Sequence, residues 1–180
     1  MTRIVVIDFA NLINDQALNQ LPTREELKKQ TGLPETNQLL YTTNTYEDTL
    51  LSTNQLTTQL HTTLHQQALY KQAKQQQNKL YKEGVLAELN RIQALGYELA
   101  ILANTRTDTI TGILAITGQQ HLFKHVHGQP PMLGVSKESQ LRALASKGKI
   151  CYLHTNDEQT LQAAQQQQLT TTQELHTITT

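Results

Sequence analysis

The stretch EGVLAELNRIQALGYELAILAN, residues 83–104, decides the fold. The apolar residues of its first half share one face of a helix: Val85, Leu86, Leu89, Ile92 and Leu95. Gly96 is placed to end that helix. The second half, residues 97–103, is an apolar run typical of a strand that is buried on both faces of a parallel sheet. A helix followed at once by a buried strand predicts an α/β protein.

The same alternation continues on both sides of this stretch. Upstream, Ile4, Val5, Val6 and Ile7 form an unbroken β-branched run that ends at Asp8, which predicts a first strand. Downstream, the patterns predict helices over 107–116, 137–146 and 157–168, and strands over 123–127, 149–154 and 169–172. Alternating strands and helices favour right-handed crossovers. We therefore expect a three-layer, Rossmann-like α/β fold with a parallel sheet between two layers of helices.

Residues 14–80 interrupt this alternation. Thr23 and Glu26 have the spacing of a capping box at a helix start, and Gly32 and Pro34 then break the pattern. Leucines recur at helical spacing in a later segment, at positions 56, 60 and 64. The sequence thus predicts an all-helical cap, residues 14–80, inserted after the first strand of an α/β core made of residues 1–13 and 81–180.

Composition disfavours several classes of protein. Lys and Arg number 15, Asp and Glu number 15, and no basic run occurs, so the chain lacks the positive footprint of a nucleic-acid-binding protein. No segment has the length and apolar character of a membrane span, and the first residues resemble a strand more than a signal peptide. A single cysteine, Cys151, leaves no disulfide framework. These features predict a cytoplasmic protein; they leave the oligomeric state open.

Ligands of such folds bind beyond the carboxyl ends of the strands. The residues that follow three of the predicted strands are 8–12, 103–108 and 154–158. Asp8 is the most prominent of them because it directly ends the first strand. An aspartate at this place could also simply cap the following turn.

The order of these segments resembles the haloacid dehalogenase (HAD) superfamily. Four segments carry the resemblance: the strand ending in Asp8, the helix and strand of 83–104, the segment HLFKHVHG at 121–128, and YLHTNDEQTLQAA at 152–164. Lys137, at the start of a predicted helix, is similar to the family's third motif. The resemblance covers residues 3–13 and 82–172, and the insertion lies where the family carries a helical cap.

The resemblance implies nucleophilic catalysis by Asp8 on a small phosphorylated or halogenated molecule. It implies that Lys137 neutralises charge on nucleophile and phosphate. It also implies a Mg²⁺ ion held by Asp8, by the backbone carbonyl of Ala10 and by an acid of the fourth motif. The alignment places Asn156 at that acid's position, and Asp157 follows one residue later.

The chain departs from the family's pattern at positions that matter for phosphatase chemistry. Ala10 stands where the family has the aspartate that protonates the leaving group, and Ala103 stands where it has the phosphate-binding Ser or Thr. Asn104 and Thr105, together with Asn11, are the remaining candidates for contacts with the substrate. These departures predict impaired or lost phosphatase activity.

Other functions stay open at this level. A dehalogenase-type attack on carbon needs neither Mg²⁺ nor the second aspartate. It needs an arginine near the cap to take the leaving group, and Arg24 is the one arginine of the predicted cap.

Phosphonate-cleaving relatives also have an alanine two residues after the nucleophile but use a cap lysine, and none of the cap lysines stands out. Asp8 and Asn11 are also similar to the start of the PIN and NYN nucleases, in which Asp108 and Asp157 would complete an acidic cluster. A non-catalytic scaffold would present its Gln- and Thr-rich cap to a protein partner that the sequence does not name.

Overall fold

The protein is described by a computed structural model that covers residues 1–31, 53–129 and 135–180. Its sheet has five strands in the order β3-β2-β1-β4-β5, and every neighbouring pair is parallel. The strands are β1 (Arg3–Asp8), β2 (Glu98–Arg106), β3 (Phe123–Gln129), β4 (Lys149–His154) and β5 (Thr171–Thr172). The predicted parallel α/β sheet is thus confirmed, with β1 and its terminal Asp8 in the middle.

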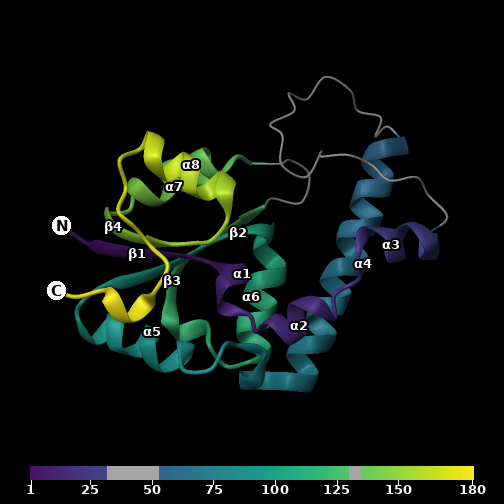
Figure 1. Cartoon of the computed structure of the whole chain (residues 1–180), viewed down its shortest axis with the longest axis horizontal. Helices are drawn as coiled ribbons and strands as arrows, with labels where there is room; N and C mark the ends of the chain where they lie inside the picture. The colour runs from purple at the N-terminus through teal and green to yellow at the C-terminus, as the bar shows by residue number, and fades with distance from the viewer. Residues whose placement is uncertain (32–52, 130–134) are drawn as a thin grey trace.

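Helices cover both faces of the sheet (Figure 1). One face packs against α5 (Val85–Ala94) and α6 (Thr107–Ile116), and the other packs against α7 (Lys137–Ala145) and α8 (Glu158–Gln166). Side chains of β1 alternate between the two layers: Val5 and Ile7 join the first core, while Ile4 and Val6 join the second. Because β1 is buried on both faces, its β-branched run has no polar alternation.

The bounds of the core elements follow the sequence closely, with one clear difference. The helix 107–116 and the strand 149–154 are as predicted. Strand β2, predicted to end at residue 103, continues to Arg106, which pairs with Gln129 of β3. Pairing with β3 on one side extends this strand through Asn104 and Thr105, two polar residues that alone indicate a loop.

The described elements between β1 and α5 are helical. They are α1 (Phe9–Leu12), α2 (Asp15–Asn19), α3 (Arg24–Thr31), α4 (Thr53–Gln76) and the 3-10 turn η1 (Gln77–Leu80). The predicted capping box is confirmed: Glu26 Oε2 accepts from Thr23 N at 2.7 Å, and Thr23 Oγ1 accepts from Glu26 N at 3.2 Å. The break at Gly32 and Pro34 lies outside the described residues, as do the side chains at positions 56 and 60. The division into cap and core stays a prediction.

The chain leaves and re-enters the core at one place. Ile13 and Tyr81 form an antiparallel bridge, and Lys82 N donates to Leu12 O at 2.8 Å. Asn14 caps α2 and also donates to the carbonyl of Leu80 at 3.1 Å. These bonds fasten the ends of the inserted helices beside the start of α5. Two further 3-10 turns, η2 (Gln120–Leu122) and η3 (Leu175–Thr177), complete the fold. Within the described residues no helix is both long and apolar enough to cross a bilayer.

Candidate active site at the carboxyl edge of the sheet

Asp8 ends the central strand and is only 5 % exposed. Its carboxylate caps the short helix α1, since Oδ1 accepts from Ala10 N at 3.3 Å. Its other oxygen, Oδ2, accepts from the hydroxyl of Thr155 at 3.1 Å. The turn-capping interpretation of Asp8 is therefore correct, and it coexists with a buried position at the edge where ligands bind in this kind of fold.

Thr155 faces Asp8 because of an irregularity in β4. Ile4 pairs with Ile150, but Val5 pairs with Tyr152, so β4 contains one more residue than β1 over this span. Ile7 therefore pairs with His154, and the next residue, Thr155, lies beside Asp8. The residue facing Asp8 is one position before the Asn156 that the sequence alignment places there, and Asn156 itself is exposed. A bulge of this kind leaves no signature in a single sequence.

Asp157 is primarily the cap of α8. Its Oδ2 accepts from Thr160 N at 2.8 Å and from Thr160 Oγ1 at 2.6 Å. Its backbone N–H donates to Thr155 Oγ1 at 3.0 Å, so the turn is held to the hydroxyl that contacts Asp8. The Asp157 charge also acts on Asp8 and on Lys137. One of its carboxylate oxygens is thus committed to the helix start.

Lys137 supplies the positive charge of the site. It is the first residue of α7, after the capping residue Ser136, and is 6 % exposed. Among the described residues no hydrogen-bond partner is within reach of Lys137 Nζ. Burial lowers the pKa of the Lys137 ammonium from its ordinary value, while the negative charges of Asp8 and Asp157 oppose that shift.

The electrostatics of Asp8 mirror those of Lys137. Burial raises the pKa of the Asp8 carboxyl above its ordinary value. The Lys137 charge and the hydrogen bonds from Thr155 and Ala10 act to lower that pKa, and Asp157 acts to raise it. The structure therefore brings Asp8, Lys137 and Asp157 within electrostatic range of one another, and their roles in a reaction stay a prediction.

The other sequence candidates lie around this trio. Asn104 and Thr105 are half-buried in the last part of β2. Asn11 is buried in α1, and its Nδ2 finds no partner in the described part of the chain. Gln140, which sequence reasoning missed, is buried and donates from Nε2 to Ala103 O at 3.1 Å. The sequence could have indicated Gln140, because it lies three residues after Lys137 and therefore shares a helix face with it.

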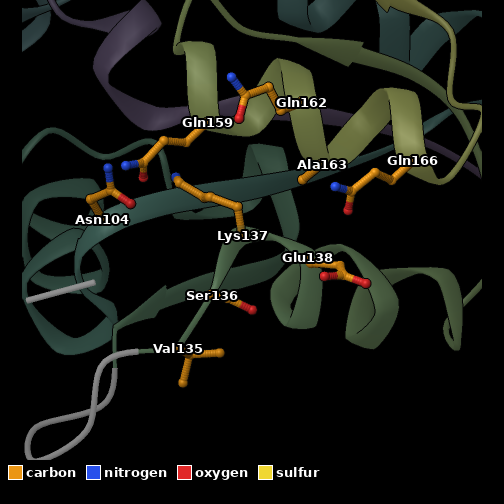
Figure 2. A pocket seen from close by; sticks show the side chains of 9 residues that line it. All are labelled: Asn104, Val135, Ser136, Lys137, Glu138, Gln159, Gln162, Ala163 and Gln166. Carbon is orange, nitrogen blue, oxygen red and sulfur yellow. The ribbon is translucent and has the colours of Figure 1, made fainter. Parts of the chain in front are cut away.

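A polar groove of about 270 Å³ opens beside Lys137, between α7 and α8 (Figure 2). The end of β2 contributes Asn104, and α8 contributes glutamines 159, 162 and 166. Figure 2 shows the Lys137 nitrogen near the amide ends of Asn104 and Gln159, whereas Glu138 and Gln166 lie toward the other end. The groove therefore extends along the helices, and Asp8 is not among its lining residues.

The side chains present fit Mg²⁺ poorly. Within the described residues there is no group of three His, Cys, Asp or Glu side chains that could hold a metal ion. Thr155 offers a neutral hydroxyl beside Asp8 and already donates it to that carboxylate. The carbonyl of Ala10 accepts from Ile13 N at 3.3 Å. Mg²⁺ favours several anionic or carbonyl oxygens around one point, and here Asp8 and one oxygen of Asp157 are the available anions.

The acidic cluster of a PIN- or NYN-type nuclease does not form in the described residues. Asp108 is exposed and is paired with Arg106 at the start of α6. It is held there as a first-turn acid, a place that the helix N-terminus favours. The observed pairing removes the residue that would complete a metal-binding set with Asp8 and Asp157.

Solved structures have a similar fold over most of the chain. A HAD-like hydrolase from Streptococcus pneumoniae matches with a TM-score of 0.65 and 13 % identity, covering 94 % of this chain and 83 % of that one. The chain has a haloacid dehalogenase-like fold. A putative HAD hydrolase from Bacillus subtilis, described as bound to magnesium, matches this chain with a TM-score of 0.59 and 15 % identity. The match covers 94 % of this chain and 85 % of that one.

A third similar structure is described as a predicted phosphoglycolate phosphatase from Haemophilus somnus. It has a TM-score of 0.62 and 16 % identity, with 94 % of this chain and 84 % of that chain covered. A scan against protein-family models finds no match, and a search of curated proteins finds none either. At such low identity the likeness establishes the HAD-like fold, and activity has to be argued from the site.

Proposed function

We propose that this HAD-fold protein retains Asp8 as a carboxylate nucleophile and acts on small phosphate esters with strongly impaired phosphatase activity. The observation that supports this most directly is the position of Asp8. It lies buried at the end of the central strand, in electrostatic range of Lys137 and Asp157. Perturbed carboxyl and ammonium groups that gather at one edge of a sheet are a frequent mark of a reaction site.

The proposed chemistry is a displacement at phosphorus. An Asp8 oxygen bonds to phosphorus as the bond to the alcohol oxygen breaks, and water later hydrolyses the acyl phosphate and restores the carboxylate. The Lys137 ammonium attracts the negative phosphoryl oxygens. No acid stands at position 10 to give the leaving alkoxide its proton, a loss that typically costs about 10²–10⁴-fold in rate. Leaving groups that need no proton are therefore the best substrates.

Charge is the second source of impairment. A phosphate dianion approaching Asp8 meets the negative charges of Asp8 and Asp157, and the Lys137 charge acts on both. In a Mg²⁺-dependent phosphatase the ion relieves this repulsion. Because the side chains here fit Mg²⁺ poorly, we propose that the residual reaction does not depend on it.

A second candidate follows from the same set of charges. Attack of Asp8 on the carbon of a small halogenated acid would expel a halide ion, and it needs neither a metal nor an acid at position 10. One buried carboxylate beside one buried ammonium suits this reaction, since the ammonium can hold the substrate's carboxylate. The Arg24 side chain that the sequence offers for the halide lies outside the described side chains.

The test compares wild type with Asp8→Asn on p-nitrophenyl phosphate and on chloroacetate, with Mg²⁺ and with EDTA. We expect slow release of p-nitrophenol that is equal in the two conditions and is abolished in Asp8→Asn. Asn keeps the shape of Asp8 and one accepting oxygen, so a loss of rate in a variant that stays folded reports the nucleophile.

Three outcomes contradict parts of this proposal. Fast, Mg²⁺-dependent turnover would show that the phosphatase is intact. Chloride release without phosphate turnover would favour the carbon-attacking candidate. No turnover of either compound would favour a non-catalytic protein that serves as a binding scaffold.

A further inference from the structure

The groove between α7 and α8 shares Lys137 with the site at Asp8, and its wall on α8 has features of a binding site that the chemistry at Asp8 does not use. Glutamines 159, 162 and 166 have the spacing of one helix face, and all three line the groove. In the described part of the chain their side-chain amides make no hydrogen bond, and the three residues are exposed. Three neighbouring free amides, each with donors and an acceptor, form a surface able to bind a polar ligand.

Lys137 gives the groove one charged and desolvated end. Its side chain lines the groove and the residue is 6 % exposed. Its Nζ atom is buried and has no hydrogen-bond partner within the described residues, so a ligand reaches it only by entering that end of the groove. A buried polar group without a partner costs free energy that a ligand atom can recover. Figure 2 shows the amides of Asn104 and Gln159 near that nitrogen, so an anion there would meet further donors.

The other end of the groove differs in charge. Glu138 lies there with Gln166 (Figure 2). One Glu138 oxygen, Oε1, accepts from Arg142, and the other oxygen is left to accept from a ligand. The groove thus has an ammonium at one end, amides along its wall and a carboxylate oxygen at the other end.

We propose that this groove binds a free amino acid or a dipeptide, a small molecule with a carboxylate at one end and an ammonium group at the other. The carboxylate lies at Lys137 and Asn104, and the ammonium lies at Glu138. The backbone or side-chain amide of the ligand forms hydrogen bonds with the glutamines of α8. A phosphate dianion suits the groove less well, because a single ammonium balances only one negative charge. The volume of about 270 Å³ is sufficient for a molecule of this size.

The test is a titration of ¹⁵N-labelled protein with L-glutamine and with diglycine, followed through the side-chain amide signals of the glutamines. We expect shifts at Gln159, Gln162 and Gln166 and little change at Gln165, which lies on α8 outside the groove lining. Diglycine amide lacks the carboxylate and N-acetylglycine lacks the ammonium. Each should bind roughly 10-fold or more weakly, the usual range for losing a hydrogen bond to a charged group.

Gln162→Ala separates the groove from the chemistry at Asp8, whereas Lys137 serves both. Gln162→Ala and Lys137→Met are expected to weaken diglycine binding, and Gln165→Ala is the matched control that should bind as wild type. The proposal is overturned if diglycine and diglycine amide shift the same signals equally, or if Gln162→Ala binds as well as wild type. Inorganic phosphate shifting these amides more strongly than diglycine would also overturn it. Because binding is read without turnover, the result is independent of the phosphatase proposal.

Discussion

The double substitution Ala10→Asp and Thr155→Asp is expected to raise p-nitrophenyl phosphate hydrolysis and to make it Mg²⁺-dependent. Ala10 is exposed, so an aspartate there has room to act as the missing acid. Thr155 lies against Asp8 at 3.1 Å, so a carboxylate in its place creates a pair of acids that can share a cation. With an alcohol leaving group that needs a proton, the gain should be roughly 10²–10⁴-fold, the usual contribution of a positioned acid.

Stability gives a second measure of the same change. Without metal, a second buried carboxylate beside Asp8 repels it, so the double variant should melt below wild type in EDTA. Mg²⁺ should recover much of that loss in the double variant and leave the melting temperature of wild type unchanged. The control is Ala10→Asn with Thr155→Asn, which adds the same bulk without charge. A double variant that ignores Mg²⁺ in both assays would show that this edge of the sheet cannot hold the ion.

Lys137→Met is expected to stabilise the fold at neutral pH by about 1–3 kcal/mol, the usual cost of a buried polar group that lacks a partner. The methionine fills a similar volume with an apolar chain. The pKa of folded Lys137 lies below its ordinary value of 10.5, so keeping Lys137 charged in the folded state carries a penalty that lowers the free energy of unfolding. That penalty is full at pH values below the folded-state pKa and fades as the pH rises toward 10.5.

The measurement is urea unfolding of wild type and Lys137→Met between pH 7 and pH 10.5. The advantage of the variant should be largest at pH 7 and should shrink with rising pH. Lys149→Met is the matched control, because Lys149 is exposed in β4 and its removal should change the unfolding free energy little at any pH. A variant less stable than wild type at pH 7 would mean that attraction to Asp8 and Asp157 outweighs the cost of burial.

Most of the fold could be predicted from the sequence because its signals are local. The β-branched run at 4–7 and the amphipathic face of 85–95 each fix an element without reference to the rest of the chain. The extension of β2 to Arg106 could not be predicted, since it depends on pairing with Gln129 of β3. Tertiary pairing overrode the polar character of Asn104 and Thr105 there.

The site could be predicted in part for a related reason. Asp8 and Lys137 were recognised because each follows a boundary that the sequence marks. Thr155 was missed because the extra residue between Ile150 and Tyr152 shifts the pairing by one, and a threonine after a strand carries no signal of its own. The groove was missed because it depends on how α7 and α8 pack together. A run of glutamines such as 165–168 reads only as polar surface until the neighbouring helix is placed.

The convergence of Asp8, Lys137 and the turn after β4 is tested most directly by NMR titration of the Asp8 carboxyl carbon. In wild type we expect a pKa above the ordinary value of 3.8, because burial is the largest influence. Lys137→Met should raise that pKa further, since the Lys137 charge acts to lower it, and Thr155→Val should do the same by removing a hydrogen bond. An Asp8 pKa that stays at its ordinary value and ignores both substitutions would contradict the site described here.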